Sequence, residues 1–168
     1  GAVSTTHALP AAAVPPQNIE AEEAVLGAML LSENAIGAVT EIIDASDYYR
    51  GSHGTVHRAC LALWGKGEPV DAITLANELE ERGELEQVGG AARIAELAAL
   101  VSATANVEHY ARIVKEAATL RGLIQAGQEI ALLDRDAVRR DPHQLAVQLT
   151  RAHAHRRARP ELAGRSHL

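Results

Sequence analysis

The stretch that decides the fold is WGKGEPVDAITLANELEERGELEQVGG, which runs from Trp64 to Gly90. Gly65 ends one helical pattern, and Pro69 cannot continue a helix, so an extended turn is expected there. Asp71 stands where an N-cap belongs, and Gly83 supplies a left-handed C-terminal position. Between them, apolar residues recur at the i, i+3, i+4, i+7 spacing of an amphipathic helix: Ala72, Leu75, Ala76 and Leu79. The stretch therefore predicts a short helix with both of its ends specified.

A second helix is expected from Ala91, after a loop that contains Leu85 and two glycines. Its apolar residues repeat the same spacing: Ile94, Leu97, Ala98 and Val101. Two helices joined by a defined loop make a packing unit. The remaining charged residues are expected on solvent faces, among them Glu78, Arg82 and the carboxylate pairs Glu22-Glu23 and Glu80-Glu81.

The composition favours an all-α protein. The chain has 168 residues, of which 47% are hydrophobic, yet it contains no Phe, one Trp and three Tyr. Its core must therefore consist mainly of Ala, Leu and similar residues, which favour helices over strands. The formal net charge of −6 argues against a surface whose main role is to bind phosphates, because that role needs clustered Lys and Arg. No strong direct nucleic-acid binding is expected.

The pattern of helices predicts a compact head of about five short helices, followed by a projecting antiparallel helical hairpin. Residues 1–17 are rich in Pro and small residues and are expected to form a disordered tail. The head is expected over residues 18–103 and the hairpin over residues 104–157, with a tail or linker at 158–168. The hairpin begins with the longest helical pattern, Thr104 to Leu133, and its second helix opens at Asp141-Pro142.

The compartment follows from two absences in the sequence. Cys60 is the only cysteine, so no intramolecular disulfide can form and a reducing compartment is expected. There is no signal sequence at the start and no run of about 18 apolar residues of the kind that crosses a membrane. A soluble, cytoplasmic protein without membrane contact is expected.

Candidate reactive residues are few. His53, His57 and Cys60 lie at i, i+4, i+7 on one helix face, but three ligands from one helix would still need a fourth from elsewhere, so packing is the favoured interpretation. Gly65-Lys66 lacks the earlier glycine and the Ser/Thr of a phosphate-binding loop. We expect no catalytic residue, no metal ligand and no cofactor in this chain.

Two patterns leave a nucleic-acid alternative open. Arg151, Arg156, Arg157 and Arg159 form a basic cluster, although cations at a helix C-terminus also complement the helix dipole. The segment TLANELEERG can be the first helix of a helix-turn-helix, which would make the protein a DNA-binding regulator. The recognition helix would then begin at Ala91, with Arg93 as almost its only group able to reach base edges.

The same central stretch resembles the N-terminal domain of the DnaB-type replicative DNA helicases of bacteria. The residues that carry the resemblance there are Pro69, Val70, Asp71, Thr74, Leu75, Leu79, Gly83, Leu85, Val88, Gly89, Gly90, Leu97 and Ala98. Further matches lie at Pro15-Pro16, Ile19-Glu20-Ala21-Glu22, Val25-Leu26-Gly27, Ala105-Asn106, Tyr110-Ala111, Ile113-Val114 and Arg121. The resemblance extends from about Pro15 to about Leu133. The second hairpin helix departs from the family pattern, because it is more basic and less apolar than usual.

This resemblance implies a non-catalytic oligomerisation and partner-docking domain. In this family the hairpins of neighbouring subunits pack together, so that six copies form a collar of three dimers that binds primase; a helicase loader is a further candidate partner. ATP and Mg²⁺ would belong to a motor domain that this chain lacks. The chain would then be either an excised domain of a longer helicase or a stand-alone relative.

The residues expected to mediate self-association lie on the long helix. These residues form an apolar stripe along the helix. The second hairpin helix, Pro142 to Arg157, is only weakly apolar and is expected to cover only part of this stripe. The stripe consists of Tyr110, Ile113, Val114, Ala117, Leu120 and Ile124.

Overall fold

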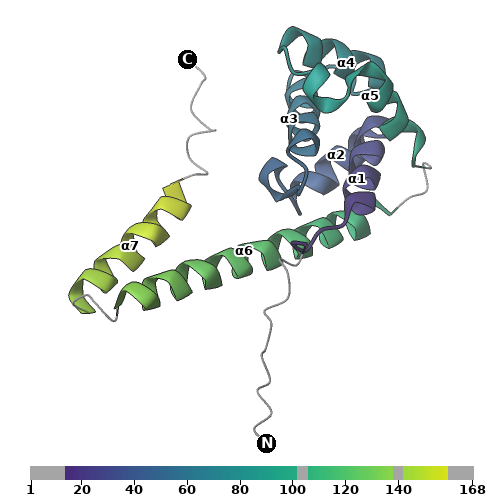
Figure 1. Cartoon of the computed structure of the whole chain (residues 1–168). Coiled ribbons are helices and arrows are strands. Elements are labelled where there is room, and N and C mark those ends of the chain that lie inside the picture. Colours follow the sequence, from purple (N-terminus) through teal and green to yellow (C-terminus); the bar gives the residue numbers. More distant parts are fainter. Residues whose placement is uncertain (1–13, 102–105, 138–141, 159–168) are drawn as a thin grey trace, which may run out of the picture. The chain divides into compact units, whose positions relative to one another are not determined.

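The computed structural model describes residues 14–101, 106–137 and 142–158, and the regular elements in these ranges are all helices (Figure 1). The all-α prediction is confirmed. In chain order the elements are α1 (Ile19–Leu31), α2 (Glu33–Thr40), the 3₁₀ helix η1 (Ala45–Asp47), α3 (Gly51–Gly65), α4 (Ala72–Glu81), the 3₁₀ helix η2 (Glu86–Val88), α5 (Gly90–Ala99), α6 (Val107–Ala137) and α7 (Pro142–Ala158). The predicted tails, 1–17 and 158–168, fall largely outside the described residues.

Local capping signals fix the start of α1 and both ends of α4. The Asn18 side chain accepts a hydrogen bond from the Ala21 amide at 2.9 Å, and Asp71 accepts one from the Thr74 amide at 2.8 Å. Gly83 follows α4 with a φ of +71°, which is the predicted left-handed position. Ser32 is an exception, because it stands at the N-cap of α2 but its side chain makes no capping hydrogen bond.

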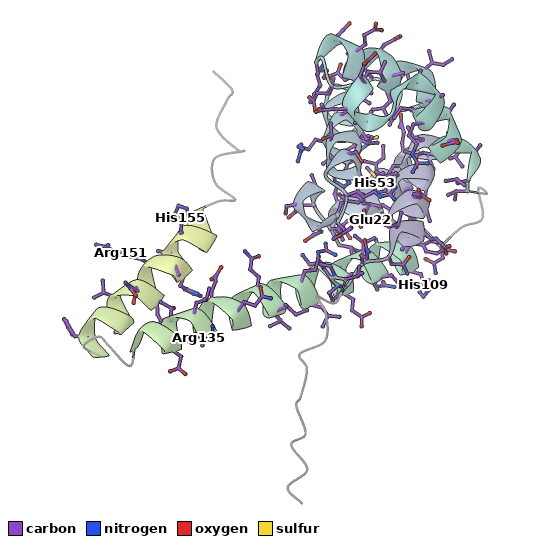
Figure 2. The ribbon with its side chains drawn as sticks, in the orientation of Figure 1. Glu22, His53, His109, Arg135, Arg151 and His155 are labelled. Carbon is purple, nitrogen blue, oxygen red and sulfur yellow. The ribbon has the colours of Figure 1, made fainter. Side chains whose placement is uncertain are left out.

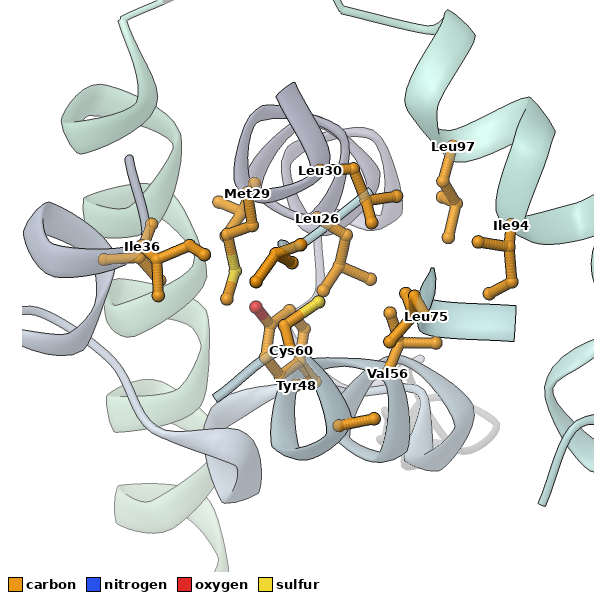
Figure 3. Packing of buried hydrophobic residues seen from close by; sticks show 14 of the residues in the cluster. Leu26, Met29, Leu30, Ile36, Tyr48, Val56, Cys60, Leu75, Ile94 and Leu97 are labelled. Carbon is orange, nitrogen blue, oxygen red and sulfur yellow. The ribbon is translucent and has the colours of Figure 1, made fainter. Parts of the chain in front are cut away.

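The core of the head is built around α1. Leu26 and Met29 of α1 are fully buried. Leu26 lies between the side chains of α3 and those of α4 and α5, whereas Met29 lies on the side of Ile36 of α2 (Figure 3). Burying a side chain of this size stabilises the fold by roughly 2 kcal/mol. Gly27 permits the close approach of α1 to α5, since a Cβ atom there would lie 2.5 Å from the Leu97 carbonyl oxygen.

The contacts divide the chain into two compact units, Gly1–Gly122 and Leu123–Leu168. The division falls inside α6, so the first part of that helix packs with the head. Ala111 and Val114 of α6 are buried in the head core, at 0% and 1% exposure. The hairpin expected over residues 104–157 therefore begins within a helix whose first turns belong to the first unit.

The second unit contains the end of α6 and the whole of α7. Figure 1 shows α7 turning back from the end of α6 as the second arm of a helical hairpin. The two helices enclose a hollow of about 200 Å³ whose lining comes from both of them: Ala126, Glu129, Ile130, Leu133, Leu149, Ala152 and His153. Within the described ranges, no helix has both the length and the apolar character needed to cross a bilayer.

Candidate functional site

A buried carboxylate, that of Glu22, connects α1 to the start of α3. Glu22 of α1 is only 1% exposed, and its oxygens accept hydrogen bonds from the Tyr49 amide at 2.8 Å and the Arg50 amide at 3.4 Å. A third bond joins it to His53 Nδ1 at 2.8 Å (Figure 2). These donors lie at the N-terminal end of α3, where a negative charge is favoured. The prediction that Glu22 is surface charge is therefore wrong, because donors distant in sequence compensate for its burial.

The other candidate metal ligands are also core residues. His57 is fully buried, and its Nδ1 forms a 2.9 Å hydrogen bond with the Tyr48 hydroxyl. Burial lowers the pKa of His57 to about 4, so this side chain is neutral at neutral pH. Burial also raises the pKa of the Cys60 thiol to about 12, so the thiol is protonated at neutral pH.

Across residues 14–101, 106–137 and 142–158, no group of three or more His, Cys, Asp or Glu side chains is placed to hold a metal ion. His53 connects α3 to Glu22 of α1, and His57 connects α3 to Tyr48 in the segment that follows η1.

The segment that contains η1 and Tyr48-Tyr49 in turn holds the first part of α6. Lys115 forms an ion pair with the Asp47 carboxylate at 3.2 Å. Arg121 donates to the carbonyl oxygens of Pro16 at 2.7 Å and of Asp47 at 2.6 Å, and its guanidinium lies 5.6 Å from the centre of the Tyr49 ring. Arg121 is one of the residues that carry the family resemblance, but the sequence alone predicts no partner for its side chain. Its partners lie too far along the chain for any local pattern to indicate them.

The residues predicted to mediate self-association are divided between the head and the exposed part of α6. Val114 is buried in the head, and Tyr110 and Ile113 pack partly against the head core. Ala117 is half-buried, whereas Leu120 is 44% and Ile124 49% exposed. Only the last two have much of their apolar side chain available to a partner.

The pair of helices considered as a helix-turn-helix is poorly suited to contact bases. Arg93 of α5 is engaged by two carboxylates, those of Glu23 and Glu96. The exposed residues around it include Ala91, Ala92 and Ala95, which have no polar side chain to offer.

A second correction concerns Glu78 of α4, which was expected on the solvent face. It is 9% exposed and forms ion pairs with Arg82 at 3.0 Å and with Lys66 at 3.5 Å. The hydrogen bond from Arg82 lowers the pKa of the Glu78 carboxyl group. Helix periodicity alone cannot indicate the burial of Glu78, because one of its partners, Lys66, lies directly after α3 and not on α4.

A comparison with known families now identifies the head. The family model of the DnaB-like helicase N-terminal domain matches residues 14–116, which is more than half of the chain. The chain belongs to this family. The resemblance predicted from the sequence is thereby confirmed.

Relatives of the DnaB-like domain agree with this assignment. The replicative DNA helicase DnaB of Mycobacterium leprae is 47% identical over 116 residues, which are 69% of this chain and 19% of that protein. The replicative DNA helicase DnaC of Bacillus subtilis is 45% identical over 118 residues, which are 70% of this chain and 26% of that protein. The chain thus spans about a quarter or less of the length of these relatives.

Solved structures match the DnaB-like domain in fold as well. The N-terminal domain of DnaB helicase from Mycobacterium tuberculosis superposes with a TM-score of 0.73 and 41% identity, covering 80% of this chain and 94% of that one. A DnaB-like replicative helicase, whose structure is described with its interactions with primase, gives a TM-score of 0.62 and 27% identity over 89% of this chain and 36% of that one.

The contacts of Arg121 in the DnaB-like domain predict a specific loss. Arg121→Ala removes two hydrogen bonds to carbonyl oxygens and the contact with Tyr49, so we expect the free energy of unfolding to fall by about 1–3 kcal/mol. Hydrogen exchange measured by mass spectrometry should become faster in residues 44–50. Arg112→Ala is the matched control, because Arg112 makes only an exposed ion pair with Glu108 at 3.3 Å. Equal exchange in the two variants would contradict the role given to Arg121.

Proposed function

We propose that residues 1–168 form the non-catalytic N-terminal part of a bacterial replicative DNA helicase, acting in the cytoplasm. In this proposal the chain associates with copies of itself through its hairpin, as three dimers in a six-membered ring, and binds primase. A helicase loader is a further candidate partner. ATP and Mg²⁺ would bind a motor domain of the parent protein, and this chain would need no cofactor. Membership of the family and the names of the relatives support the proposal.

The observation that supports the proposed self-association is the exposed apolar surface of the long helix. Leu120 and Ile124 lie four residues apart and therefore on one face of α6. Gly127 and Ala131 continue that face. Because Gly127 has no side chain and Ala131 has only a methyl group, a second helix can approach closely there. The side of α6 that lines the hollow with α7 is a different one, formed by Ala126, Glu129, Ile130 and Leu133. Ile124 and Gly127 thus lie on another side of α6 than the one that lines this hollow.

An apolar face of this kind favours association because apolar surface is removed from water. Further exposed apolar side chains lie on both helices of the hairpin: Leu123, Ile130, Leu132, Val147 and Leu149. Such a concentration is unusual for a surface that stays in water and is typical of an interaction site. Val114 is not part of this proposal, because the head already buries it.

Charged substitutions at Leu120 and Ile124 test the proposed face. We expect the double variant Leu120→Glu, Ile124→Glu to weaken self-association at least about tenfold in sedimentation equilibrium, because two carboxylates would have to be desolvated in the interface. Ile73→Glu is the control, since Ile73 is 77% exposed on α4 of the head. An unchanged dissociation constant in the double variant, with its helical content intact, would exclude this face.

Primase docking is tested with the isolated chain. In isothermal titration calorimetry, residues 1–168 should bind purified primase from the same bacterium with a stoichiometry set by the oligomer. The Leu120→Glu, Ile124→Glu variant shows whether docking requires self-association. Absence of binding by the wild-type chain at protein concentrations that give the full oligomer would contradict the proposed partner.

A further inference from the structure

The charges of this chain are strongly segregated. The first unit, residues 1–122, contains 17 Asp and Glu against 8 Lys and Arg, a formal charge of −9. The second unit, residues 123–168, contains 5 Asp and Glu against 8 Lys and Arg, a formal charge of +3. The opposite signs mean that the second unit of one copy is attracted to the first unit of another, whereas two first units repel each other.

Helix α7 concentrates the positive charge on a weakly covered surface. Residues 142–158 contain three arginines and three histidines and no Asp or Glu. Arg151 and His155 are exposed, four residues apart, and therefore on one face of the helix (Figure 2). The residues of α7 that line the hollow with α6 are others, namely Leu149, Ala152 and His153. We call the surface formed by Val147, Arg151, Ala154 and His155 the outer face of α7.

The outer face has the mixed character of a protein-binding surface. Val147 is 44% exposed and lies one helical turn before Arg151, so apolar and basic groups alternate along the face. A shallow depression is lined by Arg151, Ala152, Ala154 and His155. A partner for this face must therefore bring carboxylates together with some apolar surface.

The head provides a surface of that chemistry at the end of α4. Four glutamates lie within seven residues around the turn that leads to η2, and we call them the acidic turn: Glu80, Glu81, Glu84 and Glu86. Within the described part of the chain none of the four forms an ion pair, and the last turn of α4 contains no basic residue. Glu84 accepts a hydrogen bond from the Gln87 side chain at 3.4 Å, and the cation within the turn, Arg82, is paired with Glu78. Because carboxylates at a helix C-terminus are disfavoured by the helix dipole, the acidic turn favours a cationic partner.

We propose that the outer face of α7 in one copy docks against the acidic turn of a second copy. This inference rests on the proposed self-association and adds to it an electrostatic contact that joins the hairpin of one chain to the head of the next. A nucleic acid is a less suitable occupant of the outer face, because the charge of −9 on the first unit repels phosphates.

A charge-reversal experiment on the full chain tests the contact. Arg151→Glu, and separately Glu80→Lys with Glu81→Lys, should each weaken self-association about tenfold in sedimentation equilibrium at low salt. Arg135→Glu is the matched control, since Arg135 is an exposed arginine of the same unit on α6 and should have little effect. An equimolar mixture of the Arg151→Glu chain with the Glu80→Lys, Glu81→Lys chain should restore association, because each chain then meets a partner of opposite charge.

The outcomes separate this inference from the proposed function. If the wild-type chain does not self-associate, the proposed function fails. If it self-associates but Arg151→Glu behaves like Arg135→Glu, or the mixture does not restore association, the docking contact is wrong. Fluorescence anisotropy with a labelled single-stranded oligonucleotide tests whether the outer face binds nucleic acid instead. If Arg151→Glu abolishes nucleic-acid binding and leaves self-association unchanged, the outer face binds nucleic acid and the proposal is overturned.

Discussion

The burial of the Glu22 carboxylate is the constraint on which the packing of α1 against the start of α3 depends. A buried charge is tolerated only when hydrogen-bond donors surround it, and here the Tyr49 and Arg50 amides and His53 serve that role. Those donors cannot satisfy Glu22 unless the segment before α3 adopts one conformation. The segment is thereby fixed, and its Asp47 is held where Lys115 reaches it. The buried carboxylate on α1 thus supports the attachment of the long helix, together with the burial of Ala111 and Val114 in the head core.

The buried polar groups of the head connect its helices, and the proposed contacts with partners use exposed side chains. His57 Nδ1 and the Tyr48 hydroxyl share a hydrogen bond inside the core, whereas the buried His57 Nε2 has no hydrogen-bond partner within the described residues. The buried Cys60 is kept protonated. The surface differs in character from one unit to the other. The second unit exposes apolar side chains such as Ile124 and basic ones such as Arg151, whereas the head is strongly acidic. Both properties favour contacts between copies, and each copy would supply both halves of such a contact.

The sequence was sufficient wherever a signal and its partner lie close together in the chain. Asp71 and Gly83 specify the two ends of α4 through residues three positions away, and both behave as predicted. Glu22 was misassigned because its partners lie 27 to 31 residues further along, beyond the range of any periodicity. Its position on α1 is compatible with either a solvent face or a buried one, and only the tertiary arrangement decides.

The site residues illustrate the same limit. The apolar stripe of α6 is visible in the sequence from Tyr110 to Ile124, but periodicity does not show where a helix face changes its partner. The head covers the stripe as far as Val114 and leaves Leu120 exposed, so part of the predicted surface serves the fold of the single chain. The recognition of the family was possible because irregularly spaced residues such as Pro69, Gly83 and Gly89 specify turns, which helix periodicity alone does not produce.

The most direct test of this account compares Glu22→Gln with Glu23→Gln by hydrogen exchange. Both changes remove one negative charge from α1, but only Glu22 is bound to the segment before α3, whereas Glu23 is bound to Arg93 of α5. If the Glu22 carboxylate anchors the long helix, Glu22→Gln speeds exchange both in residues 44–50 and in residues 107–122, and Glu23→Gln leaves both segments unchanged. Faster exchange around residue 50 with unaltered exchange in residues 107–122 would contradict the account, because the long helix would then be held independently of Glu22.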